Sequence, residues 1–293
     1  MSSKRERTRK RRDAEEKPGV SGTSRHRQVS GSPADSASEE SRSLAEGPSI
    51  SIILAAGQGT RMKSSVAKVL HELAGRPLIH YVVECAMEAD LRRNVVVIGF
   101  QKQKVREALK DYPVQFVEQD QQNGTGHAVQ LALGQVAERE GAVVVLSGDS
   151  PFLRPSTLRA FMLEHVSSGC DCTVLTAVVP EPDSYGRIVR DVSGRMVAIR
   201  EEGDCSEDQK RIREVNSGMY CFKLPALLSC VGLLSDENVQ RELYLTDVVR
   251  IMHSRGMRLG TYTAPDWREI LGINTVEQLR QGEQILKELS GGR

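Results

Sequence analysis

Short apolar runs alternate with amphipathic stretches along the first half of the chain. The apolar runs have the length of buried strands and cover residues 50–54, 94–98, 114–117 and 142–146. The stretches between and after them carry apolar side chains at helical spacing, at residues 78–86, 102–109 and 125–136. This alternation predicts an α/β fold in which a doubly wound, mostly parallel sheet is covered by helices on both faces, giving three layers.

The second half has a different pattern, with more strands and longer polar connections. Strands are predicted at residues 173–179, 214–222 and 259–263, and a hairpin at residues 187–190 and 196–200. Helices are predicted at residues 245–253 and 275–289. These elements indicate a small β-rich subdomain attached to the main sheet.

Residues 1–47 follow neither pattern. They begin with a basic cluster at residues 4–12 and continue with almost no aliphatic side chain, so we expect a disordered tail. The cluster is either a weak contact for a phosphate backbone or an anionic surface, or a solvated leader, and the lack of aromatic residues favours the leader. The expected organisation is this tail, a main domain at residues 48–274 and a C-terminal helix at residues 275–293.

Composition excludes several classes of protein. The 293 residues are 39% hydrophobic and 27% charged, with a formal net charge of +1. No global field therefore favours a specific nucleic acid or a membrane surface, and no apolar run approaches a bilayer span, so no membrane insertion is expected. The six cysteines form no CxxC pair, which argues against zinc or a disulfide framework. Because the start also lacks the apolar core of a secretory signal, we expect a cytoplasmic protein.

A glycine-rich loop follows the first predicted strand. Small residues at the end of the strand leave backbone N–H groups free to face an anion, where we expect the strand to lead into a helix. Arg61 and Lys68 follow at offsets that suit a polyphosphate. A dinucleotide-binding turn would need a glycine where Met62 stands, and a Walker-type loop would end in Gly-Lys-Ser/Thr. The loop by itself is also compatible with a glycine-rich turn that binds no ligand.

Polar residues also follow the third and fourth predicted strands. Gln119 is followed by a helix start at residues 123–127, whose amides suit a base or sugar. Asp149 follows the fourth strand and suits a hard cation such as Mg²⁺, although a helix N-cap is the alternative for this residue. Because ligands bind beyond the carboxyl ends of parallel strands, we expect these residues to share one edge of the sheet.

The order of these motifs resembles a known family. LAAGQGTRM, Lys68–His71, NGTGHA, GDSP, YGRIVR, EVNSG, LYLTD and LGIN occur in the order found in the sugar-1-phosphate nucleotidylyltransferases. The match runs from about residue 52 to residue 274 and looks most like the uridylyltransferase domain of the bacterial GlcNAc-1-phosphate enzyme. Met62 and the run at residues 71–75 distinguish it from the hexose-1-phosphate thymidylyltransferases.

The resemblance implies a fold, a reaction and a set of site residues. It implies a Rossmann-like nucleotidyltransferase with a sugar-binding subdomain, which uses Mg²⁺ to transfer a uridylyl group from UTP to N-acetylglucosamine 1-phosphate, giving UDP-GlcNAc and pyrophosphate. The implied catalytic cations are Arg61 and Lys68, and the implied metal ligands are Asp149 and Asn274. The implied nucleotide-binding residues are Leu54, Ala55, Ala56, Gly57, Gly59, Gln119, Gly124 and Thr125. The implied sugar-binding residues are Ser147, Gly148, Gly186, Glu201 and Asn216.

Some residues have plainer interpretations, and two features depart from the family. Glu201 rather than Glu202 is the counterpart of the family's residue, yet taken alone it fits a solvated charge. Ala67 stands where the family usually has proline, which loosens the expected turn before Lys68. The chain stops at Arg293 without the acetyltransferase β-helix, so the resemblance implies that this second activity is absent.

Other functions remain open at this point. One is transfer to another sugar 1-phosphate or from another nucleoside triphosphate. A second is a non-catalytic nucleotide-sugar sensor, which the presence of Arg61, Lys68, Asp149 and Asn274 argues against.

Removal of the tail is expected to leave catalysis intact. A chain without residues 1–45 should release pyrophosphate at the rate of the full chain, because the tail carries none of the residues expected in the site. Steady-state turnover of the two proteins, measured side by side, checks this. A large loss of turnover in the shorter chain would reject a passive tail.

Overall fold

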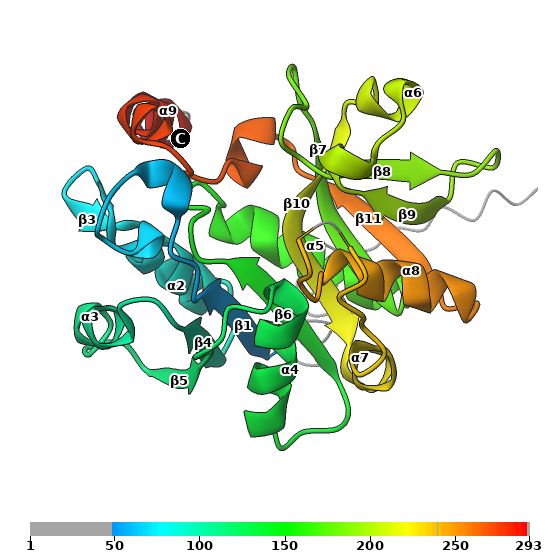
Figure 1. Cartoon of the computed structure of the whole chain (residues 1–293), viewed down its shortest axis with the longest axis horizontal. Helices are drawn as coiled ribbons and strands as arrows, with labels where there is room; N and C mark the ends of the chain where they lie inside the picture. Colours follow the sequence, from blue (N-terminus) through cyan, green and yellow to red (C-terminus); the bar gives the residue numbers. More distant parts are fainter. Residues whose placement is uncertain (1–48, 239, 292–293) are drawn as a thin grey trace, which may run out of the picture.

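The computed structural model describes residues 49–238 and 240–291, and these build a nine-stranded sheet (Figure 1). The main path of the sheet runs in the order β11-β7-β10-β6-β1-β4-β5. Its parallel centre consists of β1 (Ile50–Ala55), β4 (Arg93–Ile98), β5 (Val114–Glu118) and β6 (Ala142–Ser147). The other strands of the path are β7 (Cys172–Val178), β10 (Glu214–Lys223) and β11 (Leu259–Thr263). Only β10 runs antiparallel to its neighbours on this path.

Helices cover both faces of the sheet because successive side chains of a buried strand point to opposite faces. In β1, Ile52 packs into the core of one face and Ile53 into the core of the other, and both are fully buried. The face of Ile53 is covered by α2 (Leu78–Glu88), α3 (Lys102–Ala108) and α5 (Pro155–Ser168). The face of Ile52 is covered by α4 (Thr125–Gln135), α7 (Leu224–Val231) and α8 (Thr246–Ser254). The predicted three-layer α/β fold is confirmed.

The strand order places a switch point beside β1. From β1 the chain moves outward to β4 and β5, and it then returns across β1 to form β6 on the other side. Right-handed crossovers in opposite directions put their helices on opposite faces, which explains why α2 and α3 lie on one face and α4 on the other. Loops separate where the direction reverses, so the carboxyl ends of β1 and β6 border an open crevice.

The glycine loop does not lead directly into a helix, so that expectation was wrong. Gly59 has φ 73° and Lys63 has φ 49°, and these left-handed residues limit the intervening turn to η1 (Thr60–Met62). The chain then forms η2 (Lys68–Leu70) and a small hairpin of β2 (Glu72–Leu73) and β3 (Arg76–Pro77) before α2 begins. The loop amides therefore do not lie at the N-terminus of an α-helix.

Most other predicted elements occur within a few residues of their expected ends. The pattern analysis did not predict α5 or α7. The C-terminal helix is α9 (Val276–Gly291), which packs Leu279, Ile285 and Leu289 against a third apolar cluster around Leu73 and Phe152. The predicted tail lies outside the described residues. None of the helices in the described part of the chain is long and apolar enough to cross a membrane.

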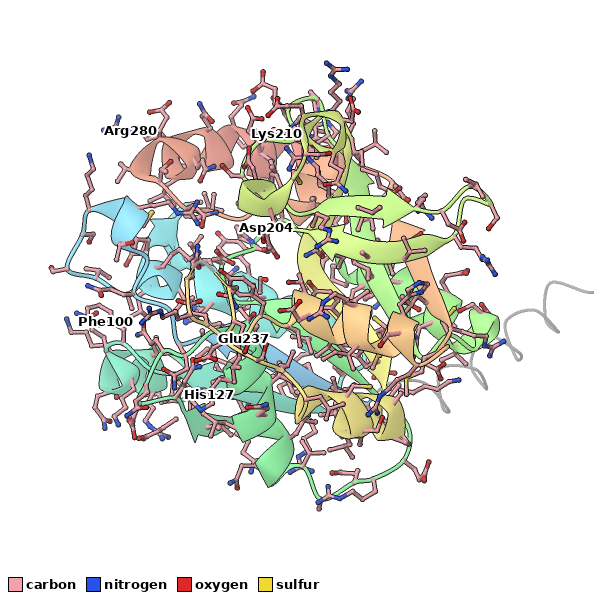
Figure 2. All side chains as sticks on the ribbon, turned by 45° about the vertical axis from the view of Figure 1, so that its right-hand side comes forward. Phe100, His127, Asp204, Lys210, Glu237 and Arg280 are labelled. Atoms are coloured by element: carbon pink, nitrogen blue, oxygen red, sulfur yellow. The ribbon has the colours of Figure 1, made fainter. Side chains whose placement is uncertain are left out.

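A hairpin of β8 (Arg187–Arg190) and β9 (Met196–Arg200) joins the sheet through pairing of β8 with β10. The hairpin is followed by a short segment with η3 (Glu202–Asp204) and α6 (Glu207–Lys210). Asp204 and Lys210 of this segment are labelled in Figure 2. The fully buried side chain of Arg187 links this segment to the hairpin. It donates to the carbonyls of Tyr185 and Lys210, and its Nη2 lies 3.9 Å from the Glu202 carboxylate.

Glu202 supplies the only carboxylate paired with Arg187 among the described residues. Glu202→Gln should lower the free energy of unfolding by about 1 kcal/mol, because it leaves a buried guanidinium without its counter-charge while solvent screens part of the loss. Urea unfolding followed by circular dichroism measures the change.

Glu207→Gln is the matched control, since Glu207 is 84% exposed and pairs only with Lys210 one turn away. Equal stability of the two variants would contradict a structural role for the Arg187–Glu202 pair.

Candidate active site

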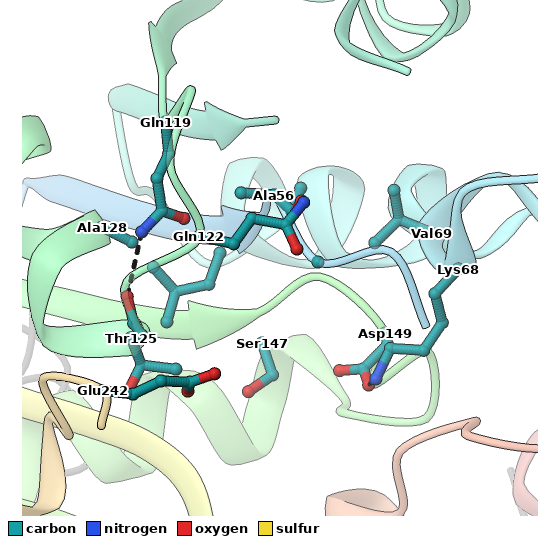
Figure 3. A pocket seen from close by; sticks show the side chains of 14 residues that line it. Ala56, Lys68, Val69, Gln119, Gln122, Thr125, Ala128, Ser147, Asp149 and Glu242 are labelled. Atoms are coloured by element: carbon teal, nitrogen blue, oxygen red, sulfur yellow. Dashed lines mark hydrogen bonds and ion pairs between the residues drawn. The ribbon is translucent and has the colours of Figure 1, made fainter. Parts of the chain in front are cut away.

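Two adjoining cavities open at the carboxyl ends of β1 and β6. The first, of about 310 Å³, has the size typical of a small-molecule site. Leu54, Thr125 and Ser147 line both cavities, so the two adjoin at these residues. Figure 3 shows Gln119 and Thr125 at one end of the first cavity, Lys68 and Asp149 at the other, and Ser147 between them.

Four predicted residues converge at the Lys68 end of the first cavity. The Lys68 ammonium forms an ion pair with Asp149 and donates to Asn274 Oδ1 at 2.9 Å. Arg61 Nη2 donates to the same Asn274 oxygen at 3.1 Å. The side chains of Lys68 and Asp149 are only 20% and 14% exposed, so solvent screens their attraction weakly. The structure thus brings two cations, a carboxylate and an amide oxygen to one place.

Lys68 is positioned by the glycine loop and by a neighbouring helix start. A Cβ on Gly59 would lie 2.5 Å from Lys68 Cβ, so only glycine lets the lysine stem pass over the loop. Ala67, which replaces the family's proline, donates its N–H to Gln101 Oε1 at 3.0 Å, a bond that proline cannot make. Gln101 Nε2 in turn donates to the Ser65 carbonyl at 2.6 Å. The two hydrogen bonds of the Gln101 side chain therefore stabilise the turn before Lys68, which we expected to be looser with alanine than with proline.

Asn274 is held by the start of α9. Gln278 Oε1 accepts from the N–H groups of Asn274 and Thr275, and Gln278 N–H donates to Thr275 Oγ1. This reciprocal arrangement is a capping box, which fixes the chain just before the helix. Ile273 N–H also donates to the Asp149 carbonyl at 2.9 Å, so the two predicted metal ligands are tied together through the backbone.

The donor set at this end suits a magnesium ion that is shared with a substrate. Asp149 and Asn274 offer a carboxylate and an amide oxygen, both hard ligands. In the described part of the chain no group of three or more His, Cys, Asp or Glu side chains is placed to hold a metal. Mg²⁺ usually takes one or two protein carboxylates and completes its shell with water and phosphate oxygens, so these residues fit it.

The opposite end of the first cavity is formed by Gln119 and the start of α4. Helix α4 begins at Thr125, as predicted. Its first N–H groups form the positive end of the helix dipole. Gln119 Nε2 donates to the Gly124 carbonyl at 3.0 Å and to His127 Nδ1 at 3.2 Å. With the amide nitrogen so engaged, Gln119 Oε1 points into the cavity as a free acceptor (Figure 3).

Close backbone packing explains the two glycines in NGTG. A Cβ on Gly124 or Gly126 would lie 2.6 Å or 2.9 Å from the Leu243 carbonyl. That approach lets Gly126 N–H donate to the Leu243 carbonyl at 2.7 Å and Leu243 N–H donate to the Asn123 carbonyl at 2.8 Å. Residues 242–245 therefore pack against the start of α4. This packing makes Glu242 part of the cavity wall.

The second cavity holds the predicted residues Gly186, Glu201 and Asn216. Thr246 Oγ1 donates to Glu201 Oε1 at 3.0 Å, while burial raises the pKa of this carboxyl above its ordinary value. Asn216 donates to the Tyr220 hydroxyl at 2.8 Å and accepts from Gly218 N–H at 3.0 Å across an irregularity in β10. Glu202 points away toward the Ser184 N–H and Arg187, so Glu201 is the carboxylate that faces this cavity.

Of the remaining predicted residues, some lie behind the cavity walls and others line them. Gly59 and Arg61 line neither cavity but contact Lys68 and Asn274, as described above. Gly148 donates its N–H to the Leu54 carbonyl at 2.9 Å and so pins β6 to β1. Asp149 caps no helix, since α5 begins at Pro155 with Arg154 before it. Leu54, Ala55, Ala56 and Gly57 line the first cavity.

Several lining residues were not predicted. Gln122 donates to the Ala56 carbonyl at 3.0 Å, and Glu242, Tyr185 and Thr246 complete the walls. Gln122 and Thr246 stand beside or inside motifs that the sequence analysis quoted, so adjacency was an available signal. Glu242 also stands directly before the motif LYLTD, but its place at the cavity wall depends on packing against a segment about 120 residues earlier in the chain.

Comparison with known proteins identifies relatives of this chain. A protein of Heliobacterium modesticaldum named bifunctional protein GlmU is 46% identical over 81% of the chain and 52% of its own length. One of the same name from Streptomyces coelicolor is 45% identical over 82% of the chain and 51% of its length. The chain thus spans about half the length of these relatives.

A solved structure, UDP-glucose pyrophosphorylase complexed with UDP-glucose, matches 82% of the chain with a TM-score of 0.67 and 20% identity, which shows a shared fold. Residues 51–203 match the MobA-like NTP transferase domain. That match covers more than half of the chain and includes the glycine loop, Lys68 and Asp149. The chain therefore belongs to the NTP transferase family and is an enzyme of the nucleotidyltransferase class.

Proposed function

We propose that the chain transfers a uridylyl group from UTP to N-acetylglucosamine 1-phosphate, with Mg²⁺, and releases pyrophosphate. The observation that carries this proposal is the convergence of Lys68, Arg61, Asp149 and Asn274 at one end of the first cavity, which adjoins the second cavity at Ser147. One cavity suits a nucleotide and the other a sugar. The phosphates of both substrates then meet at the cations. A sensor of nucleotide sugars would need binding walls but not this concentration of charge.

The free acceptor of Gln119 supports a uracil base. Uracil carries an N–H at its pairing edge, which Gln119 Oε1 accepts, whereas cytosine and adenine present an acceptor at the equivalent position. A cytosine would leave two acceptors facing one another in a poorly hydrated pocket, which is unfavourable. Apart from the Gly126 N–H, which donates to the Leu243 carbonyl, the first N–H groups of α4 suit the carbonyl oxygens of uracil.

The second cavity supports an amino sugar with several hydroxyls. Glu201 accepts hydrogen bonds, and Asn216 and the carbonyls around it add donors and acceptors at fixed positions. The motifs YGRIVR and EVNSG, which contain Gly186 and Asn216, are two of the eight motifs on which the resemblance to sugar-1-phosphate nucleotidylyltransferases rests. All six cysteines are free thiols, which supports the cytoplasm as the place of this reaction.

The chemistry follows from charge. The phosphate oxygen of a sugar 1-phosphate is already an anion and needs no general base, so the obstacle is its repulsion from the triphosphate. Lys68 and Arg61 place positive charge beside the reacting phosphates, and the loop amides of residues 55–57 donate to phosphate oxygens. Mg²⁺ bound at Asp149 and Asn274 would supply further positive charge to the phosphates. Before the substrates bind, the positive charge of Lys68 compensates the negative charge of the Asp149 carboxylate.

A pyrophosphate-release assay tests the reaction and its cations together. UTP with N-acetylglucosamine 1-phosphate should be the best pair in a panel of nucleotides and sugar 1-phosphates. Lys68→Ala and Arg61→Ala should each lower kcat by about 100-fold, because a positioned charge at the transition state is lost.

Lys104→Ala is the matched control, since Lys104 is exposed on α3 and lines neither cavity. Another preferred pair would change the proposed substrates. Turnover near that of the wild type in Lys68→Ala would contradict the role of the cations.

Metal binding is tested without turnover. Electron paramagnetic resonance of Mn²⁺ with UTP should show affinity at least about tenfold weaker in Asp149→Asn and in Asn274→Ala, since even groups behind a metal's ligands contribute roughly 10–100-fold. Asp120→Asn, at a carboxylate whose side chain is 74% exposed, should bind Mn²⁺ as the wild type does. Unchanged affinity in both site variants would place the metal elsewhere.

A further inference from the structure

Glu242 puts a carboxylate into the cavity that we assign to the nucleotide. It lines the first cavity together with Gly124, Thr125 and Ser147. Figure 3 shows its side chain beside Thr125, with the carboxylate pointing toward Ser147 and so toward the end of Lys68 and Asp149. A negative charge beside a triphosphate is unfavourable unless it faces a neutral part of the ligand.

The Glu242 carboxylate is not used to hold the fold together. Across residues 49–238 and 240–291, no hydrogen bond or ion pair reaches its oxygens. Its backbone, in contrast, is fully engaged: its carbonyl accepts from Asn238 Nδ2 at 2.6 Å, and its N–H donates to Asn238 Oδ1 at 3.3 Å. The side chain is thus a free acceptor on a fixed support.

The neighbouring contacts make this support rigid. Leu245 N–H donates to Thr125 Oγ1 at 3.0 Å, and the Leu243 backbone bonds to both sides of Gly124 as described above. Arg241, directly before Glu242, has φ 53°, a left-handed conformation that costs a non-glycine residue free energy. Tertiary contacts maintain this strain, and they hold Glu242 at the cavity wall.

The chemistry of UTP leaves one partner for this carboxylate. A carboxylate accepts hydrogen bonds and donates none. UTP has three donors, which are the N–H of uracil and the 2′ and 3′ hydroxyls of the ribose. The uracil N–H meets Gln119 Oε1 at the far end of the cavity, and the sugar substrate faces Glu201 in the second cavity. In a UTP molecule the ribose hydroxyls lie between the base and the triphosphate, and the Glu242 carboxylate extends toward this part of the cavity.

We infer that Glu242 accepts hydrogen bonds from the ribose hydroxyls of the nucleotide and selects ribonucleotides over their deoxy forms. The inference rests on the proposed function, because it uses the direction in which UTP lies in the first cavity. It assigns a specificity-determining role to a side chain that does not take part in the charge stabilisation of the phosphates.

The test compares UTP with 2′,3′-dideoxy-UTP in the wild type and in Glu242→Gln. The wild type should prefer UTP by about 10- to 100-fold in kcat/KM, because the deoxy analogue leaves a partly buried acceptor unpaired. Glu242→Gln should lose about tenfold with UTP and stay within about threefold with the dideoxy analogue. The 2′-deoxy and 3′-deoxy analogues then assign the hydroxyl that Glu242 contacts.

Glu237→Gln is the matched control, since it makes the same chemical change at an exposed site five residues earlier (Figure 2). It should keep the preference of the wild type. An equal loss with both nucleotides in Glu242→Gln, or an unchanged preference, would overturn the inference, and thermal melting of each variant separates these outcomes from misfolding.

Failure of the proposed function would be distinguishable. If the wild type turned over no sugar phosphate, calorimetric Kd values for UTP and 2′,3′-dideoxy-UTP would still decide the role of Glu242. A smaller ratio of the two Kd values in Glu242→Gln than in the wild type would support ribose recognition, and equal ratios would reject it.

Discussion

The site depends on the position of one ammonium group between two oxygens. Lys68 comes from a short 3₁₀ turn, Asp149 from the end of β6 and Asn274 from the residues before α9, and these segments meet only because the sheet edge brings them together. The attraction is partly shielded from water, so removing one partner would leave a costly charge behind. The same cation that holds the site together is the one available to phosphates.

The position of Lys68 shows how a structural substitution can be compensated. A proline before the lysine would fix φ through its ring, whereas Ala67 keeps the compatible φ of −56° and adds a hydrogen bond to Gln101. Gln101 adopts φ 52° at the start of α3 to reach both Ala67 and Ser65. The rigidity of this turn therefore comes from a residue on the next crossover. A proline at position 67 and a glutamine at position 101 would be alternative solutions to one constraint.

The sequence predicted what depends on local pattern and missed what depends on distant packing. The strands were predictable because their apolar runs face two cores, and the four charged-site residues because each follows a strand or belongs to a motif. Helix α5 was missed because it buries polar Thr157 and His165, which interrupt its apolar stripe. Gln101 and Glu242 were missed because their roles come from partners far away in sequence. The roles of the site residues themselves stay predictions.

The charges along the first cavity fix the direction in which a nucleotide lies in it. Lys68 and Arg61 stand at one end, neutral Gln119 stands at the other, and the Glu242 carboxylate extends from beside Thr125 toward Ser147. A triphosphate reversed in this cavity would move away from both cations and past a free carboxylate, and each change is electrostatically unfavourable in a partly desolvated space. In the proposed reaction this order of charges would hold the α-phosphate beside Ser147, which lines both cavities. Charge order along the wall, rather than shape alone, brings the reacting groups of the two substrates together.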